Sequence, residues 1–125
     1  MIRRMNSAMK VFAAIMLVML FTTAATAQEK DKATEGAKVV TTQMKSQLGL
    51  NDSQYTKVMD VNKIFLQKAS EAEKGTINAA EKTKKIKTLN DERDSKLKSV
   101  LTDAQYKTYT ANRITYVKKF KEYYQ

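Results

Sequence analysis

Two short segments of the chain have the same order of side chains, and that order suits the start of a helix. They are Leu50-Asn51-Asp52-Ser53-Gln54-Tyr55 and Leu101-Thr102-Asp103-Ala104-Gln105-Tyr106. The Thr102 hydroxyl can accept from the backbone N–H of Gln105, whose side chain can reach back to the N–H of Thr102. Asn51 and Gln54 take the same two roles in the first copy. With no base or metal ligand beside them, these residues are predicted to cap helices and not to catalyse or bind a ligand.

A leucine stands before each cap. Leu101 is placed to pack on Tyr106 one turn later as a hydrophobic staple, and Leu50 is placed in the same way before Tyr55. The two copies start 51 residues apart, and an amphipathic segment precedes each of them. The chain is therefore predicted to hold two helix–elbow–helix units.

The residue types that carry most enzyme chemistry are missing. The sequence has no His and no Cys, which removes the commonest general base, the thiolate nucleophile and the usual transition-metal ligands. It also has no glycine-rich phosphate loop. Asp91, Glu92 and Asp94 diverge around a helix, which favours salt bridges over a cation site. We expect no catalytic residues, no metal and no cofactor, and a protein that is not an enzyme.

The first 27 residues have the pattern of an export signal. Arg3, Arg4 and Lys10 are basic, an apolar run covers residues 11–21, and Ala25-Thr26-Ala27 is a small-residue cleavage site. The run is shorter than the roughly 17–25 residues of a membrane span. We predict a signal peptide over 1–27, cleavage near Ala27 and a periplasmic or secreted protein, with membrane contact only before cleavage. An uncut N-terminal anchor helix is the alternative.

The remaining residues, 28–125, are predicted to form a single all-α domain of about four helices. The apolar spacing places the helices at Lys30–Gln47, Asp52–Glu73, Ile77–Ser99 and Asp103–Tyr123, with elbows at Gly49–Asn51 and Leu101–Thr102. No segment alternates as a strand does. The apolar stripe of the third helix is thin and no disulfide is possible, so the protein is expected to be at least a dimer.

Positive charge is the main feature of the predicted surface. The chain has a net charge of +10, and about +7 remains after residue 27. Solvated helix faces explain much of this charge, and the alternative is a patch that binds a client or partner protein. The candidate residues for such a patch are Val40, Met44, Lys82, Lys85, Lys96, Lys118, Lys119, Tyr116 and Tyr123. Aromatics among basic residues also suit single-stranded nucleic acid, but the export signal argues against that partner.

The doubled segment resembles a known family. Leu101-Thr102-Asp103-Ala104-Gln105 matches the Leu-Thr-x-x-Gln motif of the Spy/CpxP-type (LTxxQ-motif) periplasmic proteins, and Leu50-Asn51-Asp52-Ser53-Gln54 matches it with Asn in place of Thr. The resemblance covers about residues 44–113. It implies an antiparallel dimer in which each chain is an elongated helical hairpin or cradle. It also implies an ATP-independent chaperone that holds unfolded clients on a cationic concave face. Another member of that family regulates envelope-stress signalling.

Two functions are therefore expected from the sequence. The first is an exported chaperone-like protein that binds unfolded or partly folded polypeptides in the cell envelope. The second is a regulatory or structural protein that recognises one specific envelope partner. Protection of several unrelated unfolded proteins would separate the first from the second.

Overall fold

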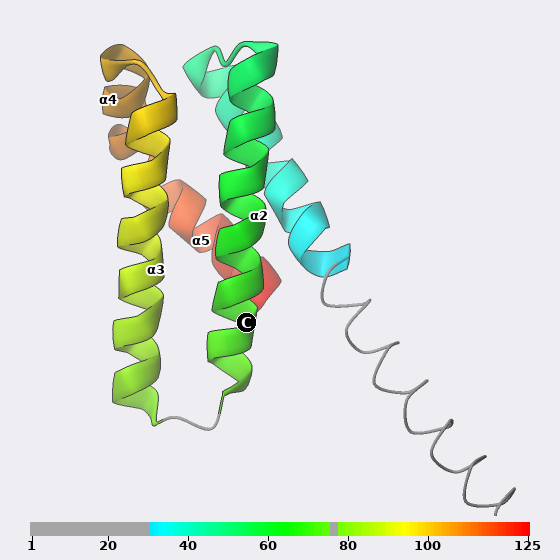
Figure 1. The fold of residues 1–125 in the computed structure, drawn as a ribbon, viewed down its shortest axis with the longest axis vertical. Helices are drawn as coiled ribbons and strands as arrows, with labels where there is room; N and C mark the ends of the chain where they lie inside the picture. The colour runs from blue at the N-terminus through cyan, green and yellow to red at the C-terminus, as the bar shows by residue number, and fades with distance from the viewer. Residues whose placement is uncertain (1–30, 76–77) are drawn as a thin grey trace, which may run out of the picture. The chain divides into compact units, whose positions relative to one another are not determined.

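The computed structural model describes residues 31–75 and 78–125, and every regular element in those ranges is a helix. The first described helix covers residues 31–48. The others are α2 (Asp52–Lys74), α3 (Ala79–Val100), α4 (Asp103–Ala111) and α5 (Arg113–Tyr124) (Figure 1). The all-α prediction is confirmed for these residues, while the predicted signal peptide lies outside them.

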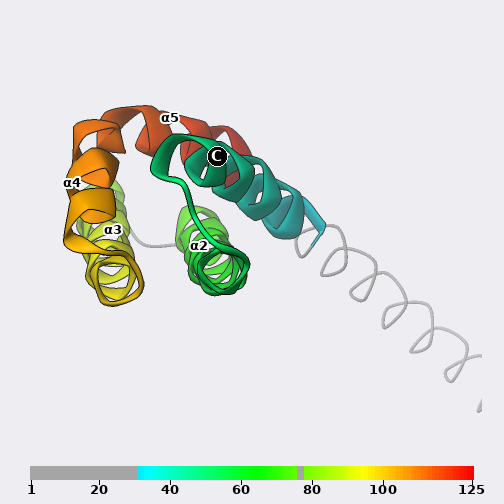
Figure 2. The same cartoon turned by 90° about the horizontal axis from the view of Figure 1, so that it is seen from above.

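Residues 32–125 form one unit in which the helices lie in two layers. Helices α2 and α3 run antiparallel, side by side, as the first layer (Figures 1 and 2). The helix 31–48 and α5 form the second layer across one face of that hairpin, and α4 leads from α3 into α5 (Figure 2). Among the described residues, no other helix covers the opposite face of α2 and α3, here called the outer face (Figure 2).

Each helix of the first layer begins at a polar cap. The helix 31–48 ends at Gly49, whose φ of 70° lies in the left-handed region that glycine adopts without strain. Asn51 then caps α2. The Asn78 side chain accepts from the N–H of Glu81 at 2.9 Å and caps α3. The described part of the third helix therefore starts at Ala79; its predicted first residue, Ile77, is outside the described ranges.

The predicted single helix over Asp103–Tyr123 is wrong, because the chain forms two helices there. Asn112 separates α4 from α5, with φ −104° and ψ 6°. Its side-chain Nδ2 donates to the carbonyl of Thr108 at 2.9 Å. Asparagine favours such local side-chain bonds over regular helix, and it redirects the chain here.

The core lies between the two layers. The helix 31–48 contributes mostly small side chains, and α5 contributes aromatic ones. The buried apolar residues of these two helices are Ala33, Ala37, Val40, Met44, Leu48, Tyr116, Phe120 and Tyr124. Gly36 is in close contact with α5, since a Cβ there would lie 2.6 Å from Cγ of Tyr123. The small residues therefore let the two helices of the second layer approach closely.

Candidate functional site

The two elbows meet in the folded chain, and each forms the predicted capping box. At the first, the N–H of Gln54 donates to Asn51 Oδ1 at 2.8 Å and the N–H of Asn51 donates to Gln54 Oε1 at 3.1 Å. At the second, the N–H of Gln105 donates to Thr102 Oγ1 at 3.2 Å and the N–H of Thr102 donates to Gln105 Oε1 at 3.0 Å. The capping prediction is confirmed at both elbows.

The two glutamines also bind each other across the elbows. Gln54 Nε2 donates to Gln105 Oε1 at 2.7 Å, and Gln105 Nε2 donates to Gln54 Oε1 at 3.2 Å. Gln54 Nε2 also donates to the carbonyl of Val100 at 3.3 Å, and Gln105 Nε2 to that of Gly49 at 3.3 Å. Val100 directly precedes Leu101 and Gly49 directly precedes Leu50. Each glutamine therefore donates to the residue before the leucine of the other motif. This joint, formed by the hydrogen bonds of Gln54 and Gln105, holds the two helix–elbow–helix units together, a role that the motif spacing alone did not reveal.

Three of the predicted surface residues are buried, which corrects their placement on a client or partner surface. Val40 and Met44 are fully covered because they face the core from the helix 31–48. Tyr116 is also fully covered: its ring stacks on that of Tyr109 at 5.6 Å, and its hydroxyl is hydrogen-bonded to Gln47. Burial raises the pKa of Tyr116. These side chains stabilise the fold and are not available to a partner.

The other predicted surface residues do not form one patch. Lys85 and Lys118 are exposed, and Lys119 pairs with Glu122 at 3.2 Å. Tyr123 is half-buried against Gly36. The remaining two, Lys82 and Lys96, lie at two different hollows that are described below.

The most unusual buried side chain was not among the predicted site residues. Arg93 on α3 is only 2% exposed. Its guanidinium carbon lies 4.4 Å from the ring centre of Phe65 and 4.8 Å from that of Phe120, so two aromatic rings from different layers enclose the charge. Leu89, Arg93 and Leu97 follow at four-residue steps and are all buried. The spacing of Arg93 between Leu89 and Leu97 is the sequence signal that indicates burial. The polarity of arginine alone predicts an exposed side chain, which is why the site residue was missed.

A small polar network surrounds Arg93. Its Nε donates to the hydroxyl of Tyr109 at 3.2 Å, and that hydroxyl donates to Asp94 at 2.6 Å. Arg113 from α5 pairs with Asp94 at 2.6 Å and with Asp91 at 3.8 Å. The salt-bridge interpretation of the acidic cluster thus holds for these two aspartates. Burial raises the pKa of Tyr109 well above its ordinary value, the hydrogen bond to Asp94 adds to this, and Arg93 opposes it.

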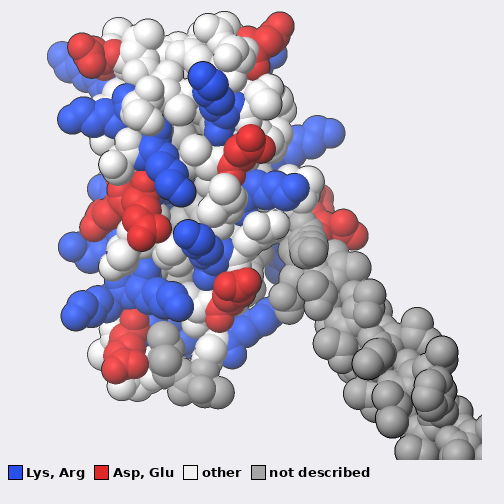
Figure 3. Space-filling view, viewed as in Figure 1, with Lys and Arg blue, Asp and Glu red and all other residues white. Residues whose placement is uncertain are grey.

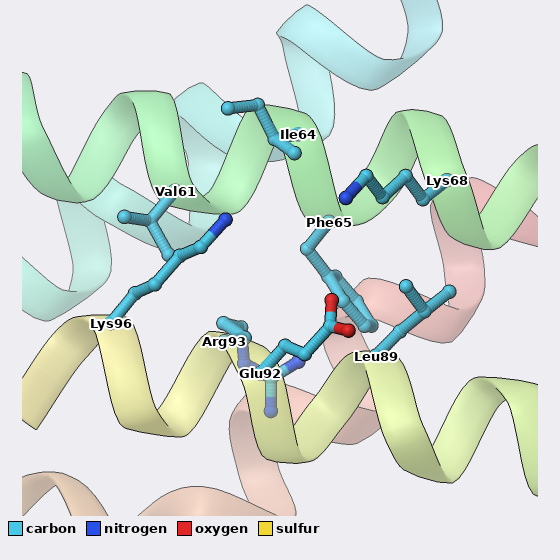
Figure 4. A pocket seen from close by; sticks show the side chains of 8 residues that line it. All are labelled: Val61, Ile64, Phe65, Lys68, Leu89, Glu92, Arg93 and Lys96. Atoms are coloured by element: carbon cyan, nitrogen blue, oxygen red, sulfur yellow. The ribbon is translucent and has the colours of Figure 1, made fainter.

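A pocket opens on the outer face directly over this network (Figure 4). Val61, Ile64 and Phe65 from α2 form its apolar wall together with Leu89 from α3. Lys68 from α2 and Lys96 and Glu92 from α3 extend over it, and Arg93 lies at its base. The space inside is only about 10 Å³.

The pocket belongs to a face that is rich in charge. Lys and Arg side chains are spread along both α2 and α3, with acidic groups between them (Figure 3). Ile64 is 41% exposed there, which makes it one of the few large apolar side chains exposed in the described residues. Lysines next to exposed apolar groups can attract a polypeptide and then hold it by short-range contacts.

A second hollow lies between the end of the α2–α3 hairpin and the end of α5. It holds about 380 Å³ and combines basic, acidic, apolar and aromatic groups. Its lining residues are Glu73, Ala79, Lys82, Thr83, Ile86, Lys121, Tyr124 and Gln125. The pKa of Tyr124 is raised by burial and by Glu73, against the effect of Arg93. The hollow is wide and mixed in character, so it indicates no particular ligand.

Within the described ranges, no cluster of three or more acidic side chains could hold a metal ion. No helix described here is long and apolar enough to cross a membrane.

The two helix–elbow–helix units and their joined elbows form a small all-α protein of two helix layers. The chain belongs to the family described as "Domain of unknown function (DUF4890)", which matches residues 23–109, more than half of its length. No curated protein and no solved structure matches the chain significantly.

Proposed function

We propose that the protein is an exported, ATP-independent, chaperone-like protein that binds unfolded or partly folded polypeptides in the cell envelope. The observation that carries this proposal is the pocket on the outer face, where an apolar wall is bordered by lysines from two helices. Long-range attraction by lysine would bring a chain to this face, and apolar contact would hold it. Cleavage near Ala27 and a periplasmic or secreted location are part of the same proposal.

The resemblance to the Spy/CpxP-type proteins supports the proposal at the two elbows, where Leu50, Gln54, Leu101 and Gln105 agree with the motif. The elbows are joined by side chains that the motif specifies. A cradle-like homodimer is the corresponding assembly, and the few apolar residues that α3 buries, Leu89 and Leu97, favour it. Light scattering of the mature protein tests the dimer; a monomer mass at every concentration would exclude it.

The proposal predicts protection without a nucleotide. The mature chain, residues 28–125, in several-fold excess and at low salt, is expected to suppress the aggregation of two unrelated unfolded substrates. Raised salt should slow capture because it screens the lysines over a Debye length of about 8–10 Å. Mass spectrometry of the exported protein gives its first residue, expected to be Gln28.

A matched pair of variants locates the surface that holds clients. Ile64→Ser should reduce protection, because Ile64 is an exposed apolar side chain at the pocket. Ile114→Ser makes the same change on α5 at a residue that is 74% exposed, and it should leave protection unchanged. Equal loss in both variants would place the holding surface elsewhere.

The alternative is a regulatory or structural protein with one specific envelope partner. The wide hollow lined by Lys82 and Lys121 favours this alternative, because protein interfaces combine charged, apolar and aromatic groups as this hollow does. Failure to protect either unfolded substrate, together with capture of one partner from the native envelope, would replace the chaperone reading with this one.

A further inference from the structure

The charges at the outer-face pocket are unbalanced. Lys68 and Lys96 extend over it and make no ion pair within 4.0 Å in the described part of the chain. Glu92 is the one acidic group among the lining residues, against two lysines and Arg93. An added negative group at this position would therefore meet net positive charge.

Arg93 gives an independent indication of a missing partner. Its side chain is fully buried. Its Nε donates to Tyr109 and its Nη2 to Asp94, but its buried Nη1 has no hydrogen-bond partner. A buried guanidinium N–H left without an acceptor is unfavourable, and a carboxylate oxygen is the acceptor that suits it best. Arg93 lies at the base of the pocket, so an acidic group that entered there would lie close to a cation whose hydrogen bonds are incomplete.

The free space shows why the site is closed in the unbound chain. About 10 Å³ holds no more than one water molecule. The Glu92 carboxylate extends over the pocket from α3 toward α2 (Figure 4). Glu92 is exposed and can rotate outward, whereas the apolar wall belongs to two packed helices. A ligand carboxylate can enter only when Glu92 leaves.

We propose that the pocket takes the carboxylate of an acidic side chain in the bound polypeptide, and that Glu92 competes for this place within the chain. This inference rests on the proposed function, because it names the client feature that the pocket recognises. The Ile64 side of the pocket contacts an apolar neighbour of that acidic residue, so the favoured segment combines Asp or Glu with large apolar residues. Lys68 and Lys96 bind the carboxylate once Glu92 has moved.

The test uses two fluorescent peptides that alternate Leu with either Asp or Asn, and the mature protein at low salt. Glu92→Gln should bind the Asp peptide about three- to ten-fold more tightly than the unchanged protein, because it removes a like charge beside the ligand. Its affinity for the Asn peptide should stay the same. The double variant Lys68→Gln, Lys96→Gln should bind the Asp peptide about ten-fold more weakly than the unchanged protein. Circular dichroism and thermal melting verify that each variant is folded.

Glu35→Gln on the helix 31–48 is the matched control, since it changes the net charge equally at an exposed glutamate in the other layer. Equal affinity gains in the Glu92 and Glu35 variants would overturn the competition. Equal binding of both peptides would overturn the acidic preference while the proposed function stands. Binding of neither peptide would overturn both. An acidic polysaccharide that binds as tightly as the Asp peptide, with the same dependence on Glu92, would replace a polypeptide ligand with a polymer.

Discussion

The two halves of the described chain, residues 31–74 and residues 79–124, have the same elbow design and differ in the side chains that they place in the core. With the 51-residue offset between Gln54 and Gln105, four buried residues of one half align with buried residues of the other. The aligned buried pairs are Leu50 with Leu101, Val58 with Tyr109, Phe65 with Tyr116, and Ala69 with Phe120. The leucines at the elbows are identical, whereas in the other three pairs the second half has the larger, aromatic side chain. These three positions are thus buried in both halves but filled with different volumes.

The difference teaches that the halves are complementary and not interchangeable. Phe120 of the second half packs edge-on against Phe65 of the first at 5.0 Å. Tyr123 packs against Gly36, and any side chain at position 36 would collide with its ring. The first half instead buries a small polar pair, in which Asn62 donates to Thr41 at 2.9 Å. The shared elbows set the positions of the helices, and the unequal side chains decide how closely they pack.

The largest effect is expected where the two halves enclose a charge. Arg93→Ala should lower the free energy of unfolding by about 3–5 kcal/mol, because it leaves a cavity between Phe65 and Phe120 and takes one partner from Asp94. Urea denaturation at fixed protein concentration measures it. Lys87→Ala, an exposed residue of the same helix, should change it by less than about 0.5 kcal/mol. Similar losses in both would mean that the enclosed charge does not join the halves.

Gly36 provides the next test of complementarity. Gly36→Ala should destabilise by about 1–3 kcal/mol, because the new methyl group would meet Cγ of Tyr123 at 2.6 Å and Leu66 at 2.9 Å. A helix otherwise gains about 0.5–1 kcal/mol from this change, so the sign is informative. The aligned position in the second half is the exposed Lys87, where alanine is expected to change stability little. Thermal unfolding that shows Gly36→Ala to be stabilising would contradict the close packing.

The buried tyrosines of the second half are expected to lower the free energy of unfolding at alkaline pH. Burial raises the pKa of Tyr109 above its ordinary value of 10.0. The contribution of the neutral Tyr109 hydroxyl to the free energy of unfolding is complete below about pH 10. It is lost as the pH rises further, because the unfolded chain then releases a proton that the folded chain keeps. The slope is about 1.4 kcal/mol per pH unit for one group. Tyr109→Phe should remove that part of the slope, measured by urea denaturation between pH 9 and 11; an unchanged slope would exclude Tyr109 as its source.

The smallest effect tests what the halves share. In a double-mutant cycle, Gln54→Ala and Gln105→Ala should show a coupling energy of about 1 kcal/mol, because each amide is the partner of the other. Gln54 and Gln67 lie about 20 Å apart along α2 and should show none. Denaturant unfolding of the four proteins in each cycle gives both values. Additive losses at Gln54 and Gln105 would mean that the elbows act separately.

Much of the fold could be predicted because its signals are local. The caps at Asn51 and Thr102 and the helix end at Gly49 depend on neighbours within one helical turn, and the capping residues are correct. The break at Asn112 was missed because one asparagine in an otherwise helical pattern gives a weak signal. Hydrophobic spacing placed the helices well, apart from that break.

The candidate site was harder to predict because it depends on side chains from separate helices. From its residue type Arg93 is expected to be solvated, because the sequence does not show that Phe65 and Phe120 will enclose it. Val40 and Met44 were assigned to the surface, although their spacing on the helix 31–48 suits a buried stripe. Glu92 and Lys68, which line the same pocket, lie on different helices and share no local sequence pattern. A pattern within one helix cannot show which residues of another helix will cover it.

The joint between Gln54 and Gln105 also has a consequence for how the chain opens. It fastens the starts of α2 and α4 at the same end of the unit, with hydrogen bonds that link positions 51 residues apart. The end near Glu73 and Gln125 instead borders a hollow of about 380 Å³. Local unfolding begins where buried contacts are fewest. Backbone amides are therefore expected to exchange their hydrogens fastest at that end and slowest in the helical turns next to the joint. Opening of the unit is expected to start at the end with the hollow and to leave the joint closed.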